Sequence, residues 1–222
     1  MIRWNRFKCN RHMAGVVIAV ICFIFVTGCS VVGIRTTEEA SYTVLAEYDQ
    51  IEIREYKELV VVETDVDASY DKAGNIAFKK LFGYISGENV SQSKIAMTAP
   101  VISKERNADT GEKVAMTSPV IGEKQGQGWR YSFVLPAGYT LETAPLPTNP
   151  EVNLSLIPRK KVAVIRYSGL WREPAMREKS DELVEWIQTN GIERLSTPRS
   201  AGYDPPWTLP FLRRNEIMVD VK

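Results

Sequence analysis

After position 29 the sequence contains no cysteine and no histidine. The chain has 222 residues with three cysteines and one histidine, and Cys9, His12, Cys22 and Cys29 all fall within the first 29 positions. The rest of the chain therefore has no means to form an internal disulfide, a Cys/His zinc site, a cysteine nucleophile or a Ser-His-Asp triad. It also lacks a Gly-x-Gly-x-x-Gly sequence and a P-loop, so no motif supports nucleotide binding.

The first 29 residues have the pattern of a leader. Met1 to Arg11 carries four basic residues and no acid, and an apolar run of 13 residues, Ala14 to Val26, follows. Such a run is too short to cross a hydrocarbon core of about 30 Å as a helix, but it suits the apolar centre of a signal peptide. The junction Gly28-Cys29 resembles the bacterial lipoprotein signal, in which the cysteine thiol accepts the lipid. We therefore expect residues 1–28 to be a signal peptide and Cys29 to be lipidated, with an uncleaved N-terminal membrane anchor as the alternative.

The same resemblance predicts a location. Ser30 after the lipidated cysteine favours the outer membrane, so we expect a bacterial cell-envelope protein that faces the periplasm, with residues 29–41 as a short tether. Removing the leader takes four of the 28 basic residues and none of the 27 acidic ones, which leaves a formal charge of about −3. Because no basic excess remains to neutralise a phosphate backbone, we do not expect nucleic-acid binding.

The mature chain alternates between strand and helix patterns. Apolar residues recur every three or four positions over 71–85 and 173–189, which predicts two amphipathic helices. The order is strands, helix, strands, and then strands, helix, strand, which predicts two similar α+β halves that pair into one sheet or barrel. The predicted strands are a pair over 42–56 with a turn at Asp49-Gln50, and single strands over 59–66, 129–135, 152–157, 161–167 and 217–221.

A short internal repeat lies in the middle of the chain. Lys94–Ile102 reads Lys-Ile-Ala-Met-Thr-Ala-Pro-Val-Ile and returns as Lys113–Ile121, offset by 19 residues. Two β-rich segments around a polar turn predict a hairpin. We interpret the matched Met97 and Met116 as core residues rather than as soft metal ligands.

Several segments together resemble the SOUL haem-binding protein family, and the resemblance covers residues 42–222. It implies an α+β fold, a distorted eight-stranded antiparallel β-barrel with two flanking helices, built from two pseudo-symmetric halves. The segments that carry the resemblance are Ile51–Tyr56, Tyr84–Asn89, Lys94–Val101, Phe133–Pro136, Ala163–Gly169, and Gly202–Pro206 followed by Arg213–Glu216.

The resemblance implies that haem or another tetrapyrrole binds in an apolar cleft beside the first helix. The positions at which family members contact the ring correspond to Phe78 and Phe82. A loop near the C-terminus, which forms another wall of the cleft in the family, corresponds to the residues near Trp207. At helical spacing, Phe78, Leu81 and Phe82 suit a plain core as well as a cofactor wall. Both interpretations stay open from the sequence.

Two departures from the family pattern concern charge and iron. Family cations on the first helix fall on Asn75 and Gly83 here, so Lys79 or Lys80 is expected to take the propionates, although a solvated face is the plainer interpretation of this pair. A histidine that some members carry on the first strand is replaced by Glu55. If haem binds, the iron has no histidine axial ligand. Either the iron takes Met, Tyr, Lys or water as its ligand, or the protein holds the ring by its faces alone.

Two hypotheses follow. The first is a lipid-anchored haem- or tetrapyrrole-binding protein of the cell envelope, which acts as a carrier, buffer or scavenger and not as an enzyme. The second is an envelope structural or interaction protein that keeps the SOUL-like fold without binding haem. No constellation of acids, tyrosines or lysines indicates a catalytic site.

Overall fold

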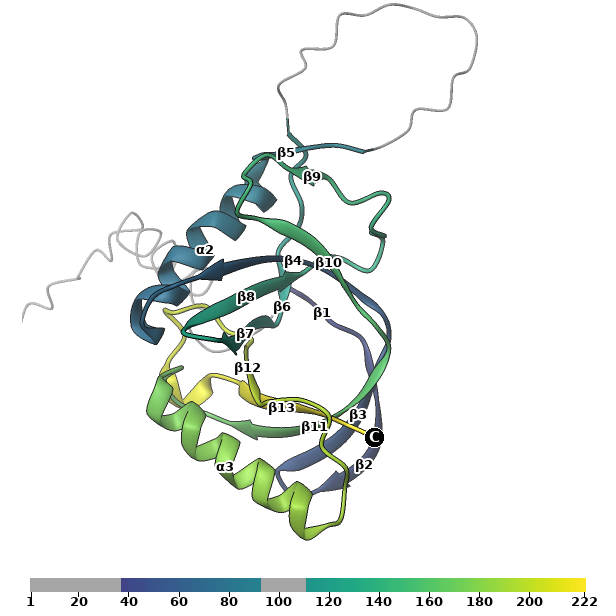
Figure 1. The fold of residues 1–222 in the computed structure, drawn as a ribbon, viewed down its shortest axis with the longest axis vertical. Helices are drawn as coiled ribbons and strands as arrows, with labels where there is room; N and C mark the ends of the chain where they lie inside the picture. Colours follow the sequence, from purple (N-terminus) through teal and green to yellow (C-terminus); the bar gives the residue numbers. More distant parts are fainter. Residues whose placement is uncertain (1–36, 93–110) are drawn as a thin grey trace, which may run out of the picture.

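Two helices cover the outer face of one large, strongly curled antiparallel sheet (Figure 1). The computed structural model describes residues 37–92 and 111–222. The α+β barrel-like architecture predicted from the sequence is confirmed. The curled sheet contains nine strands, one more than the expected eight, because β2 pairs with the edge of β3 that β11 leaves open.

The helices begin and end close to the predicted positions. Helix α2 spans Tyr70–Ser86, and it stops at Gly87, whose φ of 121° lies in the left-handed region that glycine tolerates. Helix α3 spans Glu173–Thr189 and has a proline in its first turn, where no helical N–H bond is lost. Trp186 of α3 is partly buried; it packs against the apolar cluster under the helix and also meets Tyr48, with ring centroids 5.1 Å apart.

The sheet order is β10-β4-β8-β7-β12-β13-β11-β3-β2. Two further pairs lie outside it, a parallel pair of β1 with β6 and an antiparallel pair of β5 with β9. The strands are β1 (Glu38–Glu39), β2 (Tyr42–Tyr48), β3 (Ile51–Tyr56), β4 (Leu59–Val66), β5 (Asn89–Val90), β6 (Thr117–Ser118), β7 (Val120–Gln125), β8 (Gly128–Val134), β9 (Leu146–Pro147), β10 (Asn153–Ile157), β11 (Lys160–Tyr167), β12 (Arg199–Gly202) and β13 (Asn215–Val221).

The two halves share one topology. The first half runs β4, α2, β7, β8 and the second runs β11, α3, β12, β13, and in each the last strand lies between the other two. The halves meet where β7 pairs with β12. The strand that precedes each half is exchanged, because β3 pairs with β11 while β10 pairs with β4. The exchange interlocks the halves into one sheet.

The predicted hairpin differs from the structure. Its first arm, Lys94–Ile102, lies outside the described residues. In the second arm, 113–116 are not a strand, since Val114 donates its N–H to the carbonyl of Ile85 at the end of α2, at 2.9 Å. Met116 is therefore exposed, and its interpretation as a core residue is wrong.

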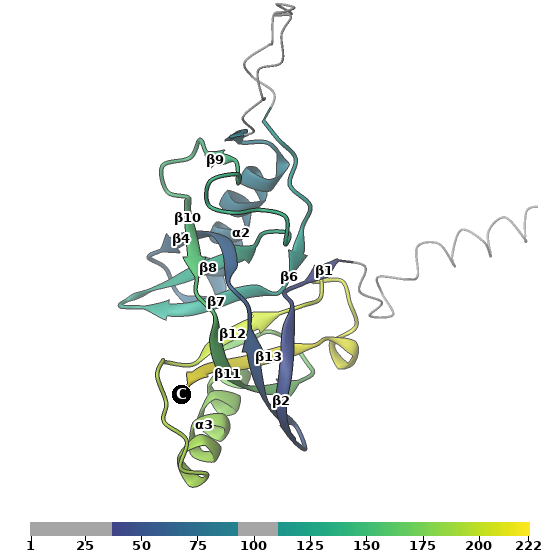
Figure 2. The same cartoon turned by 90° about the vertical axis from the view of Figure 1, so that its right-hand side faces the viewer.

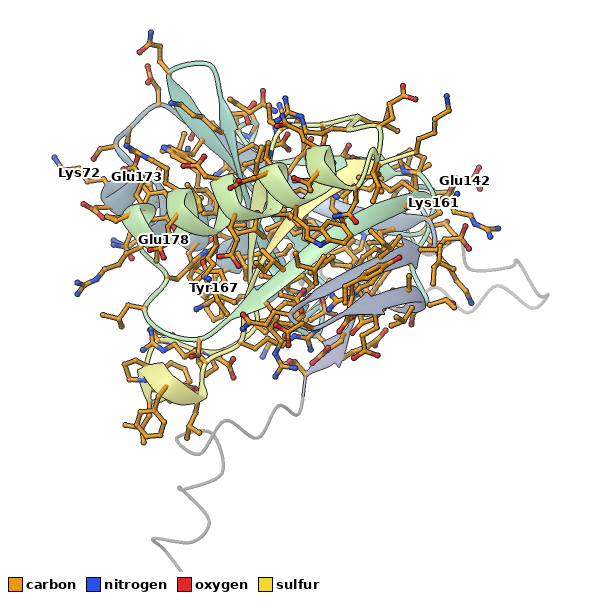
Figure 3. The ribbon with its side chains drawn as sticks, turned by 90° about the horizontal axis from the view of Figure 1, so that it is seen from below. Lys72, Glu142, Lys161, Tyr167, Glu173 and Glu178 are labelled. Atoms are coloured by element: carbon orange, nitrogen blue, oxygen red, sulfur yellow. The ribbon has the colours of Figure 1, made fainter. Side chains whose placement is uncertain are left out.

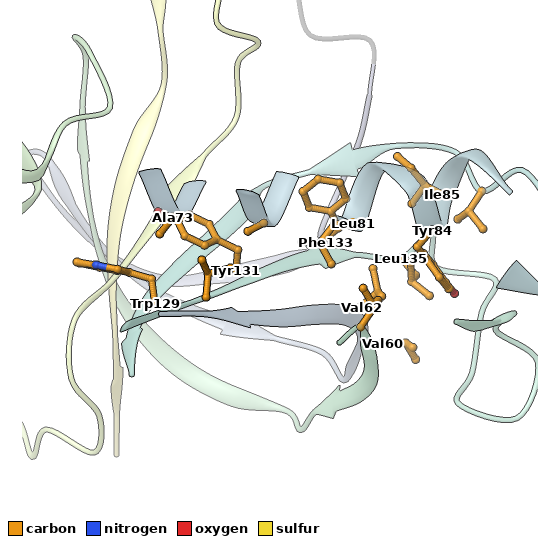
Figure 4. Close-up of a cluster of buried hydrophobic side chains, with 14 of the residues drawn as sticks. Val60, Val62, Ala73, Leu81, Tyr84, Ile85, Trp129, Tyr131, Phe133 and Leu135 are labelled. Carbon is orange, nitrogen blue, oxygen red and sulfur yellow. The ribbon is translucent and has the colours of Figure 1, made fainter. Parts of the chain in front are cut away.

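Three apolar clusters hold the fold together. One fills the space between α2 and the sheet (Figure 4), a second lies under α3, and a third fills the inside of the curl. A fully buried Leu such as Leu81 or Leu183 contributes about 1.5–3 kcal/mol by leaving water. In Figure 4 the side chains of α2 that face the sheet are Ala73, Leu81, Tyr84 and Ile85.

A charged cluster lies at the edge of the third apolar cluster. Arg54 donates two hydrogen bonds to Glu216, at 2.8 and 3.0 Å, and Arg214 donates a third at 2.8 Å. Tyr203 donates a fourth, at 2.7 Å. Burial would raise the pKa of Glu216, but the hydrogen bonds from Arg54 and the charges of both arginines outweigh it and hold that pKa below 4.5. The buried carboxylate is fully partnered and joins β3 to β13.

Candidate functional site

Helix α2 exposes two aromatic rings to solvent. Phe78 and Phe82 lie one helical turn apart and are 40% and 49% exposed. Their rings are stacked, with centroids 5.8 Å apart and planes 13° from parallel. Leu81, from the same sequence pattern, is fully buried. The core interpretation therefore holds for Leu81, whereas the phenylalanine pair forms an apolar surface.

The pair continues onto the sheet below it. The Phe78 ring meets the edge of Phe133 on β8, with centroids 5.4 Å apart. Phe133 is paired in register with Val120 on β7, which is paired in turn with Gly202 on β12. Val120 is partly exposed. With strands about 4.8 Å apart, the row Phe133–Val120–Gly202 crosses roughly 10 Å of the outer face. We call Phe78, Phe82 and this row the aromatic strip.

Trp171 closes the far end of the row. A Cβ on Gly202 would lie 3.2 Å from the Trp171 ring, so the indole rests directly on this glycine. Trp171 also meets Tyr131 edge-on, at 6.2 Å. No sequence pattern singles out Trp171, whose only local signal is its place just before the second helix. The strip is thus bounded by phenylalanines from α2 on one side and by a tryptophan on the other.

Trp207 lies on the loop that follows β12 and is 63% exposed. Among the described aromatic residues, no ring contact joins Trp207 to Phe78 or Phe82. The loop begins directly after Gly202, the last residue of the row, and a hydrogen bond of 2.9 Å from the N–H of Gly169 to the carbonyl of Pro210 fastens it. The structure thus brings the two phenylalanines together, and it leaves Trp207 on an exposed part of a loop that starts at the other end of the row.

The two lysines beside the strip differ in their partners. Lys80 forms an ion pair with Glu151, at 3.0 Å. Lys79 is exposed, and the described part of the chain gives it no ion pair. At Gly83, where family members carry a cation, a Cβ would come within 2.4 Å of a Glu88 oxygen. Of these two lysines, Lys79 is therefore the one whose charge is available to a ligand.

A family model described as SOUL heme-binding protein matches residues 37–220. The chain belongs to this family. The SOUL family is a binding family rather than an enzymatic one, and it supports a general tetrapyrrole-binding role for this member. No curated protein matches the sequence.

The solved structures that resemble this SOUL protein share its fold at low identity. The C-terminal domain of EcmrR is 13% identical over 78% of this chain and 97% of that chain, with a TM-score of 0.49. The EcmrR chain in a cryo-EM structure of an EcmrR–DNA complex is 10% identical, with a TM-score of 0.53; the match covers 95% of this chain but only 65% of that one. A hydrolase from Listeria innocua is 15% identical over 80% of this chain and 94% of that chain, with a TM-score of 0.47. Of the three, the EcmrR chain with a TM-score of 0.53 supports a shared fold, and at 10% identity it shows the fold alone.

The acidic side chains of the described residues do not group into a metal site. Within 37–92 and 111–222, no group of three or more His, Cys, Asp or Glu residues could hold a metal ion. Glu55, at the position of the family histidine, is paired with Arg159 at 2.6 Å, and the hydrogen bond from Arg159 lowers the pKa of Glu55. It lies on β3, between β2 and β11.

Two surface hollows lie away from the phenylalanine pair. The first runs along α3 and is lined by charged side chains, among them Glu173 and Glu178 in Figure 3. The second lies between β1 and the segment after β8, and its lining includes Glu38, Lys57 and Tyr139. Both linings carry charges that a flat apolar disc would leave without partners. Neither of these two hollows is lined by residues of α2, so neither is the apolar cleft that the family resemblance implies beside the first helix.

Proposed function

We propose that this SOUL protein is a lipid-anchored haem- or tetrapyrrole-binding protein of the bacterial cell envelope, and that it holds the ring by its apolar faces rather than through a histidine. The observation that carries the proposal is the stacked and exposed pair Phe78–Phe82, which stands on Phe133 beside the partly exposed Val120. Large apolar side chains kept in water in this way mark a binding surface.

The strip fits the shape and the charge of the ligand. A tetrapyrrole is a flat apolar disc, and parallel or edge-on aromatic rings are its natural contacts. In this proposal Phe78 and Phe82 contact one part of the disc, and Trp207 is the predicted far wall. Lys79 is the cation that we assign to a propionate, since Lys80 is already paired with Glu151. Membership of the SOUL family supports tetrapyrrole binding in general.

The protein contributes binding, and the bound group contributes any iron chemistry. The only histidine in the sequence is His12, inside the predicted leader, so a mature chain would offer the iron Met, Tyr, Lys or water at most. Affinity would then come from contacts with the ring faces. This suits a carrier, buffer or scavenger in the envelope rather than an enzyme.

The anchor is proposed from the sequence of the leader. Lipidation at Cys29 after removal of residues 1–28 would attach the domain to the membrane. Mass spectrometry of the N-terminal peptide tests this, because an acylated Cys29 adds the mass of its acyl groups. Each buried CH₂ of the lipid adds about 0.8 kcal/mol to membrane affinity. No helix in 37–92 or 111–222 is long and apolar enough to span a bilayer.

The test is a pair of titrations of residues 30–222, one with hemin and one with iron-free protoporphyrin IX. We expect a saturable shift of the Soret band for both ligands at micromolar protein, with dissociation constants within about threefold of each other, because the contacts are made to the ring. Hemin binding that is far tighter would contradict face-only binding. If neither ligand binds, the protein is instead an envelope structural or interaction protein with a SOUL-like fold.

Lys79 is tested by neutralising its charge. Lys79→Gln should raise the hemin dissociation constant about two- to fivefold, in keeping with loss of one exposed ion pair of up to about 1 kcal/mol. Lys72→Gln, another exposed lysine of α2 two turns earlier, is the matched control and should leave the constant unchanged. Equal effects from both substitutions would assign the change to general charge and not to a propionate.

A further inference from the structure

The loop between β12 and β13 displays three large apolar side chains within five residues. Trp207, Leu209 and Phe211 are all exposed, and Phe211, at 71%, is the most exposed of the large apolar residues in the described ranges. Thr208, between the first two, is buried. We call residues 203–213 the tail loop. Its apolar side chains point outward from a backbone that is itself anchored to the domain.

The tail loop is held in one shape by hydrogen bonds. Arg213 donates from its Nε to the carbonyl of Thr208, at 2.8 Å, and also donates to the carbonyl of Pro206. The N–H of Arg214 bonds to the carboxylate of Asp204, at 2.6 Å, across the base of the loop. Because the backbone is fixed, little conformational freedom would be lost when the exposed side chains bind a partner.

The tail loop lies beside the point where the described chain starts. Glu39 on β1 pairs with Arg214 at the base of the loop, at 2.9 Å. In Figure 2, β1 and the yellow loop lie on the same side of the molecule. Only seven residues lie between Cys29 and Thr37, so the eight steps from one to the other reach at most about 29 Å when fully extended. A lipid on Cys29 would therefore hold this side of the domain at the membrane.

We propose that the tail loop inserts Leu209 and Phe211 into the surface of the lipid bilayer. The inference rests on the lipid anchor of the proposed function for its choice of partner. Leu and Phe suit this position because a bilayer interface accepts apolar side chains beside polar head groups. The loop follows Gly202 of the aromatic strip, so insertion would hold the strip close to the bilayer, where an apolar tetrapyrrole partitions.

Site-specific photo-crosslinking tests the insertion in the intact protein. The full chain is expressed with its leader, with the photoreactive amino acid p-benzoylphenylalanine in place of Phe211, and is irradiated in envelope membranes. Leu195 is the matched control site, since it is 58% exposed and its N–H bonds to Asp220, at the other end of β13 from the tail loop. Mass spectrometry reads the phospholipid adduct and the acyl group on Cys29 from the same sample.

We expect phospholipid adducts from position 211 at least tenfold more often than from position 195. Adducts at equal frequency from both positions, adducts only to protein at 211, or none at 211 would each overturn the inference. Lipid adducts at 211 in a chain without acylation at Cys29 would uphold insertion and reject the anchor. Hemin titration of the same Phe211 variant reports separately on the proposed function, because Phe211 is not among the residues of the aromatic strip.

Discussion

The two halves of the molecule share a topology but present different surfaces. In the first half, α2 turns Phe78 and Phe82 outward. In the second, no large apolar side chain of α3 is exposed, and its outer face carries the ion pairs Glu173–Arg177 at 2.9 Å and Lys179–Glu182 at 2.6 Å. Both helices nevertheless bury a leucine completely against the sheet.

The difference separates the residues that make the fold from those that make the site. Repeated elements need the same kind of buried face, because each helix must cover one side of the sheet. Their outer faces are free to differ. The exposed parts of the two phenylalanine rings add nothing to the core, and their presence on one helix alone is what the proposed function of that half explains.

The largest expected effect comes from breaking the buried charged cluster. Glu216→Ala should lower the free energy of unfolding by about 3–5 kcal/mol, because it leaves the guanidinium groups of Arg54 and Arg214 buried without their carboxylate. Urea denaturation measures the change. Glu52→Ala is the control, since Glu52 binds the same Arg54 at 2.6 Å but is partly exposed, and it should cost about 1 kcal/mol or less. Equal losses of unfolding free energy in the two variants would show that the buried carboxylate stabilises the fold no more than the partly exposed one.

The same carboxylate makes stability depend on pH. Its pKa in the folded protein lies below 4.5, so its contribution is complete above the unfolded pKa and is lost as pH falls through the folded value. Wild type should therefore lose stability on acidification below about pH 4.5. Glu216→Gln resembles the protonated form, so the stability gap between wild type and Glu216→Gln should narrow as the pH falls. A gap that stays constant down to pH 2.5 would contradict the assignment.

Matched leucines compare the two cores directly. Leu81→Ala on α2 and Leu183→Ala on α3 remove side chains that are both fully buried, and each should cost about 2–5 kcal/mol. Thermal unfolding followed by circular dichroism gives both values. If the halves are equivalent as scaffolds, the two losses agree within about 1 kcal/mol, and a much larger difference would mean that one half carries the fold.

The smallest effect is expected on the outer face of α3. Arg177→Ala removes an exposed ion pair with Glu173, worth about 0.3–0.5 kcal/mol on a helix surface. Hemin affinity should not change, because this face lies on the other helix from Phe78 and Phe82. Loss of hemin binding in Arg177→Ala would mean that the second half contributes to the ligand site, and it would contradict the assignment of binding to the first half.

Local patterns predicted most of the elements. The strand at 59–66 and the helix at 173–189 were predicted with the bounds that the structure shows, because their apolar periods are long and uninterrupted. Strand β12 was not predicted, since Arg-Ser-Ala-Gly is short and has little β-propensity. It becomes a strand only because β7 and β13 supply partners on both sides.

The residues of the candidate site were harder to predict from the sequence than the helices and strands. Helical spacing placed Phe78, Leu81 and Phe82 in one group, and only the rotation of α2 on the sheet separates the buried leucine from the exposed rings. The contact of Trp171 with Gly202 joins residues from different elements, and the pairing of Arg54 with Glu216 spans 162 positions. Neither leaves a local periodic signal.

The central claim is that the phenylalanine pair of the first half binds the tetrapyrrole. Its most direct test is an equilibrium hemin titration of the double variant Phe78→Ala, Phe82→Ala beside Ile76→Ala, which removes an equally exposed apolar side chain from the same helix. We predict at least a tenfold rise in the dissociation constant for the double variant, about 1.4 kcal/mol, and less than a twofold rise for the control. A double variant that binds hemin as tightly as wild type would contradict the account.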